Sequence, residues 1–169
     1  RYPIDSDGIV LVGESNGGML AYRAAARLKP RVAGIAVIAG AMFTGQEAPS
    51  PGVSAWIFHG GGDRAIPPSG GYSEVEQVRQ LQTAPFLTMA EALGFWMTVN
   101  QCSGSEVETS ADRLVATTRG ADCSGGARVE SWRSATVAHG WPKGAQLGDR
   151  SFETELHAFI SDVVGGPAR

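Results

Sequence analysis

The sequence predicts an α/β fold in which a mainly parallel sheet carries helices on both faces. Short apolar runs of strand length alternate along the chain with stretches of helical periodicity, which is the order of elements that builds such a sheet. The runs at residues 9–12, 32–39 and 55–58 are apolar throughout, as in strands that are buried on both faces. With 169 residues, 43% hydrophobic and 18% charged, the chain fits one compact domain over residues 1–169.

The N-terminal part predicts a strand, a sharp turn and a helix. The apolar run at residues 9–12 ends at Gly13, and from Gly17 apolar side chains recur at helical spacing. Lys29 and Pro30 then supply a basic last turn and a helix breaker.

The same patterns place the remaining elements. Further strands are expected at residues 32–39, 55–58 and 128–133, with an extended piece at 114–118 inside the polar segment 102–126. Helices are expected at residues 73–82, 85–99 and 152–164. Pro85 suits a first helical turn, because the amide at that position has no partner within the helix.

Charge and hydropathy exclude several classes of function. The formal net charge is -3 and no block of Lys and Arg occurs, which argues against a surface for nucleic acids or anionic membranes. The longest mostly apolar run, residues 32–43, is shorter than the roughly 20 residues of a membrane-spanning helix. Residues 1–5 show no basic start followed by an apolar stretch, so no secretion signal is expected within this chain. Small or neutral ligands therefore fit this composition better than nucleic acids or anionic membranes do.

Residues 13–18 contain the pattern G-x-S-x-G, with Ser15 at its centre. Because Ser15 falls between a buried strand and a helix, the small flanking residues allow a sharp turn that holds the hydroxyl outward. This context favours a nucleophile. The alternative is an ordinary glycine-rich turn between strand and helix, including one that binds phosphate.

A serine nucleophile needs a base, and the base needs a carboxylate to orient it. His157 lies in the expected terminal helix and fits a surface position, whereas His59 closes a strand and fits a structural, hydrogen-bonded role. His139 lies in a loop with Gly140 and Pro142, where catalytic side chains often occur. Asp63 follows the strand at 55–58. Ser15, Asp63 and His139 are therefore all expected beyond the carboxyl ends of strands, where parallel sheets bind ligands.

The order Ser, Asp, His is that of α/β-hydrolases. The stretches at residues 13–23, 59–67 and 139–142, with Phe95-Trp96 and Asn100-Gln101-Cys102, resemble the polyhydroxybutyrate depolymerase and feruloyl/acetylxylan esterase group of that fold. Glu14 departs from the small or apolar residue expected before the serine. The resemblance implies Ser15 as nucleophile, Asp63 as orienting acid and His139 as general base.

The activity implied by the resemblance is that of a serine carboxylic-ester hydrolase that works through an acyl-enzyme without metal or organic cofactor. Its substrates would be polyester or plant cell-wall-type esters, with hydroxyalkanoate, feruloyl or acetyl groups. Two alternatives stay open: a noncatalytic fragment or binding module of hydrolase fold, and a serine peptidase of the same fold. Trp56, Trp96 and Trp132 fit core packing, and Trp141, beside the proposed base, is a candidate for the substrate pocket.

The spacing of the two cysteines leaves two free thiols and one disulfide equally open. The resemblance implies a disulfide between Cys102 and Cys123, and with it an oxidising compartment, so that the protein would be secreted or periplasmic.

The family resembled places about half of its sheet, and a loop that supplies one oxyanion donor, before the nucleophile strand. Here twelve residues precede Gly13, and the backbone amide of Asn16 is the one donor that the sequence indicates. We therefore expect an α/β-hydrolase-type domain truncated on its N-terminal side. Residues 9–12 would then form an apolar edge strand, open to pairing with the missing half or with another chain.

Overall fold

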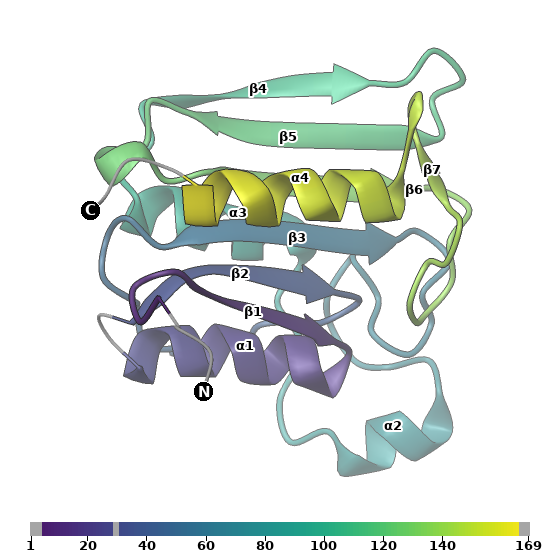
Figure 1. Cartoon of the computed structure of the whole chain (residues 1–169). Helices are drawn as coiled ribbons and strands as arrows, with labels where there is room; N and C mark the ends of the chain where they lie inside the picture. Colours follow the sequence, from purple (N-terminus) through teal and green to yellow (C-terminus); the bar gives the residue numbers. More distant parts are fainter. Residues whose placement is uncertain (1–4, 29–30, 166–169) are drawn as a thin grey trace, which may run out of the picture.

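The computed structural model describes residues 5–28 and 31–165, and its centre is a six-stranded sheet in the order β1-β2-β3-β6-β5-β4 (Figure 1). The first four strands in that order are mutually parallel, and β5 runs antiparallel to both of its neighbours, β6 and β4. The predicted mainly parallel α/β sheet is thus confirmed. The strands are β1 Ile9–Glu14, β2 Val32–Ile38, β3 Ser54–Gly60, β4 Gly104–Thr109, β5 Val115–Ala121 and β6 Val129–Ser134.

Helices cover both faces of the sheet, as expected. Helices α1 (Asn16–Arg27) and α3 (Met89–Val99) pack on one face, where Tyr22 and Trp96 join the same buried cluster as Ile35 and Ile57. Helix α4 (Phe152–Gly165) covers the opposite face. Its buried apolar side chains pack with Trp56, Phe58 and Trp132, so three of the four tryptophans lie in the core.

Two predicted helices are shorter than their sequence patterns suggested. The prediction of a helix start at Pro85 was wrong, because a capping box at Thr88 fixes the start of α3. In it Glu91 donates its amide to the Thr88 hydroxyl at 3.0 Å, and Thr88 donates its amide to the Glu91 carboxylate at 2.7 Å. Helix α2 spans only Glu76–Leu81, because the residues on either side of it, Val75 and Gln82, have extended backbones.

The polar segment 102–126 forms a hairpin whose outer strand β4 the sequence did not predict. All six residues of β4 are exposed, so they lack the alternation of apolar and polar residues that marks a half-buried strand. The extended piece predicted at 114–118 belongs to β5. The implied disulfide between Cys102 and Cys123 is present and closes the base of this hairpin.

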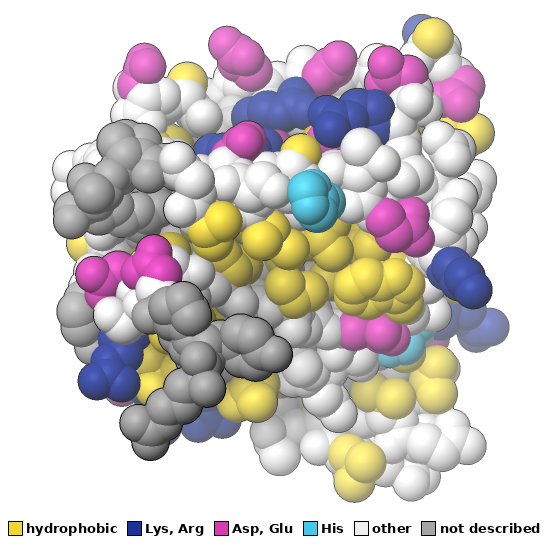
Figure 2. All heavy atoms as spheres, viewed as in Figure 1, with side chains coloured by type: hydrophobic (Ala, Val, Ile, Leu, Met, Phe, Trp, Pro, Cys, Tyr) yellow, Lys and Arg dark blue, Asp and Glu magenta, His cyan; other side chains and the backbone are white. Residues whose placement is uncertain are grey.

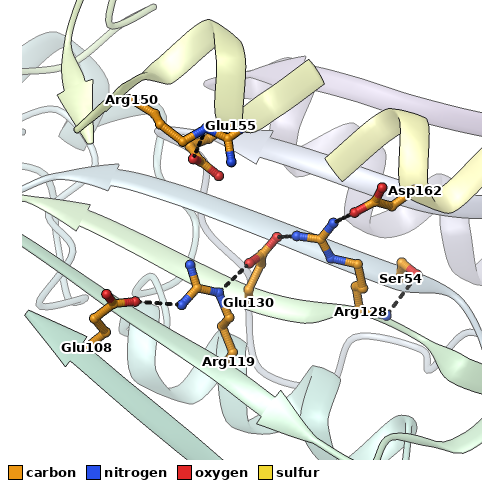
Figure 3. Close-up of polar contacts among 8 residues, drawn as sticks. All are labelled: Ser54, Glu108, Arg119, Arg128, Glu130, Arg150, Glu155 and Asp162. Atoms are coloured by element: carbon orange, nitrogen blue, oxygen red, sulfur yellow. Dashed lines mark hydrogen bonds and ion pairs between the residues drawn. The ribbon is translucent and has the colours of Figure 1, made fainter. Parts of the chain in front are cut away.

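A network of ion pairs ties the hairpin to the rest of the sheet (Figure 3). Glu130 on β6 is 2% exposed and lies between the guanidinium groups of Arg119 and Arg128, at 3.2 and 2.7 Å. Arg119 also contacts Glu108 on β4, and Arg128 contacts Asp162 on α4. Because a buried carboxylate is destabilising without its partners, this network fixes the antiparallel strands against α4.

The sheet has an apolar edge at β1, whereas every residue of β4 at the other edge is exposed. Among the described strands β1 has only β2 as a neighbour, and Val12 on β1 is 44% exposed, so the apolar edge expected from the sequence is present. Figure 2 shows hydrophobic side chains gathered beside α4 and in front of β1 and β2.

Within the described ranges, no helix combines the length and the apolar character needed to cross a bilayer. A two-stranded ribbon, β7 (Gln146–Leu147) with β8 (Arg150–Ser151), leads into α4. The predicted basic turn and breaker at Lys29 and Pro30 lie outside the described residues.

Candidate active site

Ser15 occupies a strained turn between β1 and α1. Its backbone has φ 53° and ψ -120°, a conformation that residues other than glycine rarely adopt. Two backbone hydrogen bonds hold the turn. The Ser15 amide donates to the carbonyl of Ile38 at 2.8 Å, and the Ser15 carbonyl accepts the amide of Met19 at 3.0 Å. Strain of this kind persists only where the surroundings impose it, and it is common at functional sites.

Close packing around the turn explains its glycines. A Cβ on Gly13 would lie 2.2 Å from the carbonyl oxygen of Gly17, and one on Gly18 would lie 2.8 Å from Val37. A Cβ on Gly17 would meet nothing within 4 Å. The glycines that this packing requires are therefore Gly13 and Gly18, although Gly17 is the one that completes the sequence pattern.

Asp63 lies in the turn that follows β3 and is 3% exposed. Its Oδ1 accepts the backbone amides of Ala65 and Ile66 at 3.0 and 2.8 Å. Its Oδ2 faces two imidazole nitrogens, Nε2 of His59 at 3.2 Å and Nδ1 of His139 at 2.8 Å. Burial acts to raise the pKa of Asp63, but the hydrogen bonds from His59, Ile66 and His139 outweigh it and hold the pKa below its ordinary value.

His139 joins the carboxylate to the hydroxyl. Its Nδ1 faces Asp63, and its Nε2 lies 3.0 Å from Oγ of Ser15. Because a carboxylate only accepts hydrogen bonds, Nδ1 of the neutral ring carries the proton, and Nε2 is left to accept the Ser15 hydroxyl. The imidazole is 31% exposed.

The loop that carries His139 is anchored to the turn after β3. Gly62 donates its amide to the carbonyl of Val137 at 3.0 Å, and a Cβ on Gly60 would lie 2.1 Å from that same oxygen. This close approach needs a glycine at position 60. The turn of Asp63 and the loop of His139 therefore hold each other in place.

The structure thus brings together Ser15, Asp63 and His139, the three residues that the sequence singled out. His157 is exposed on α4, as expected. His59 is buried and hydrogen-bonded, also as expected, but its contact with Asp63 was not foreseen. The spacing of four residues between His59 and Asp63 around a strand end was the available signal.

The amide of Asn16 lies at the start of α1. The first amides of a helix have no acceptor within the helix, and the helix dipole makes this end partially positive. Asn16 directly follows Ser15 and is the first residue of α1.

A cavity of about 330 Å³ opens beside Ser15 and His139. Its wall includes an aromatic pair, Phe43 and Phe86, with ring centres 5.5 Å apart. None of the described residues that line it is Asp, Glu, Lys or Arg. The other apolar lining side chains are Met19, Ala65, Ile66, Val78 and Leu81.

Trp141, which the sequence offered as a pocket wall, does not line this cavity. Its ring packs edge-on against Phe152, with centroids 5.2 Å apart, and the side chain remains 43% exposed. Phe43 and Phe86, which the sequence did not single out, line the cavity instead.

In residues 5–28 and 31–165 no three His, Cys, Asp or Glu side chains gather in a way that could hold a metal ion. What the site offers is a hydroxyl, an imidazole and a carboxylate in one hydrogen-bonded chain. Neither protein-family models nor curated proteins give a match to this chain.

Proposed function

We propose that this protein is an α/β-hydrolase-type serine carboxylic-ester hydrolase that works through an acyl-enzyme. The observation that carries the proposal is the hydrogen-bonded chain from Ser15 Oγ through His139 to Asp63, with contacts of 3.0 and 2.8 Å. A hydroxyl, an imidazole in the accepting tautomer and a buried carboxylate are the parts that activate a serine at neutral pH.

In the proposed reaction, Ser15 Oγ attacks the carbonyl carbon of the ester while His139 Nε2 takes the hydroxyl proton. Asp63 stabilises the positive charge that forms on the imidazole. The tetrahedral intermediate then collapses: the bond to the alcohol oxygen breaks, and His139 returns the proton to that oxygen. A water molecule attacks the acyl-enzyme by the same route and releases the acid.

The negative charge of the intermediate forms on the former carbonyl oxygen. The Asn16 amide, at the positive end of α1, supports this charge in our proposal. Because it becomes useful only as charge develops, this contact would favour the transition state over the bound ester.

The cavity beside Ser15 supports an ester with an uncharged, apolar group. Apolar side chains, including an aromatic pair, form most of its wall. No described lining residue is an Asp, Glu, Lys or Arg that could pair with a charged group of the substrate. Hydroxyalkanoate, feruloyl and acetyl esters, which the sequence resemblance implies, satisfy this condition. We propose these as the substrate class.

The disulfide between Cys102 and Cys123 supports an oxidising location. We accordingly propose that the protein works in the periplasm or outside the cell, where polymeric esters occur and where a disulfide persists.

Labelling with a fluorophosphonate probe, together with turnover of p-nitrophenyl esters, tests the proposed activity. The wild-type chain should label and turn over, and Ser15→Ala should lose both. Ser161→Ala is a matched control, because Ser161 also lies near an imidazole, 3.4 Å from Nδ1 of His157, but on the surface of α4. This control should behave as wild type.

A wild-type chain that neither labels nor turns over esters would contradict the proposal and leave a noncatalytic module of the same fold. Faster cleavage of peptides than of matched esters would instead point to a peptidase.

A further inference from the structure

The buried histidine His59, near the end of β3, contacts the carboxylate of the site. Its Nε2 lies 2.7 Å from the carbonyl oxygen of Ile66 and 3.2 Å from Oδ2 of Asp63. A carbonyl oxygen only accepts hydrogen bonds, so Nε2 of His59 must carry a proton. His59 therefore donates to Ile66 and, in the same fork, to Asp63.

Two imidazoles thus donate to one carboxylate oxygen. Oδ2 of Asp63 receives Nε2–H of His59 and Nδ1–H of His139, whereas Oδ1 receives two backbone amides. The backbone amides and His139 already fix where the carboxylate lies. What His59 adds is partial positive charge against the oxygen that faces His139.

We infer that His59 is a positioning residue that acts through Asp63 and limits how strongly this carboxylate attracts the proton-bearing form of His139. The consequence for ester hydrolysis rests on the proposed function, but the coupling between the two rings does not. Loss of the His59 donor leaves more negative charge on Oδ2, which favours the charged imidazole and reduces the fraction able to accept the Ser15 proton.

The other charged groups around the site are more exposed than His59. Glu14 at the end of β1 approaches the loop of His139, since a Cβ on Gly140 would lie 3.6 Å from Glu14 Oε1. Arg64 pairs with Glu74 at 2.9 Å, and Arg133 on β6 lines a cavity with Asp63. All four side chains are exposed and screened by water, whereas His59 is 2% exposed.

The first experiment compares two variants in the pH profile of kcat/KM for a p-nitrophenyl ester. His59→Phe keeps the ring shape and removes the donor, and its acid limb should move to higher pH by about half a unit. His59→Gln keeps an N–H near the position of Nε2, so it should restore the wild-type limb. A purely structural role would lower activity without moving the limb.

The second experiment uses the wild-type protein and needs neither turnover nor a folded variant. The ring N–H protons of His59 and His139 are followed by proton NMR between about pH 5 and 8. The His59 resonance should shift together with that of His139, because both protons share Oδ2.

The two experiments separate the two proposals. If the wild-type chain has no esterase activity, the proposed function fails, and the NMR titration alone decides the role of His59. If the His59 resonance stays constant while that of His139 moves, or if the acid limb of folded His59→Phe stays within about 0.1 pH unit of wild type, the inference is overturned.

Discussion

Two turns of this molecule, residues 13–18 after β1 and residues 59–66 after β3, contribute to the same site in opposite ways. The first turn is strained at Ser15 and presents its hydroxyl at the surface end of the hydrogen-bonded chain. The second turn buries Asp63 and supplies three of the four N–H donors to its carboxylate, and His139 supplies the fourth.

The difference follows from what each group would do in the proposed reaction. A nucleophile has to reach a substrate, so its turn holds the backbone rigid and leaves the side chain accessible. An orienting carboxylate has to keep its charge and direction inside a low-dielectric site, so its turn saturates both oxygens. Four expected outcomes, given in order of decreasing size, would test this contrast.

Asp63→Asn should reduce kcat by roughly 10⁴-fold. With the amide oxygen placed to accept the Ala65 and Ile66 amides, the NH₂ group would face two N–H donors, and His139 would turn to the tautomer that cannot accept the Ser15 proton. Steady-state kinetics measure the effect. Asp112→Asn, in the exposed turn between β4 and β5, is the control and should leave kcat unchanged. A loss below tenfold would show that the carboxylate does not orient the base.

Gly13→Ala should lower the free energy of unfolding by about 3 kcal/mol, because the new methyl group would overlap the backbone of Gly17. Gly17→Ala is the matched variant on the same turn. It should be neutral or should stabilise α1 by up to about 1 kcal/mol, since alanine is the better helix former. Urea unfolding of both variants measures the contrast, and equal losses would contradict the packing described for the turn.

Because of Asp63, the free energy of unfolding should depend on pH in the acid range. Its folded pKa lies below its unfolded value, so its contribution is complete above the unfolded pKa and is lost as pH falls through the folded pKa. The free energy of unfolding should therefore fall on acidification from pH 7 to below 3, on the order of 1 kcal/mol more in wild type than in Asp63→Asn. Urea titrations at the two pH values test this. Identical acid dependence in both proteins would remove Asp63 as a source of stability.

Ser15→Gly should raise the free energy of unfolding by about 1 kcal/mol while it abolishes labelling by a fluorophosphonate. Glycine adopts positive φ without the steric cost that a serine side chain bears at φ 53°. Ser15→Ala, which keeps a Cβ, should gain less. Thermal unfolding of the two variants side by side gives the measurement. A destabilised Ser15→Gly would mean that the turn is not strained.

The sequence predicted the elements and residues that depend on short-range patterns. The apolar runs of β1, β2 and β3, the strand pattern of β6 and the glycine-rich turn around Ser15 were visible in the order of residues. The triad candidates followed from their places after strands, and the pairing of Cys102 with Cys123 from family resemblance. Strand β4 was missed because it is exposed on both faces. The start of α3 was misplaced because reciprocal bonds between Thr88 and Glu91 outweighed the preference of proline for a first turn.

The order of residues alone established which chemical groups this protein carries and that the main strands are buried, since hydrophobic periodicity and turn residues act over a few neighbours. The folded structure was needed to show that Oδ2 of Asp63 contacts two histidines, that Trp141 packs on Phe152, and that Phe43 and Phe86 line the cavity beside Ser15. These contacts join residues from separate elements. Their geometry depends on how strands and helices pack in three dimensions, which no local pattern of residues encodes.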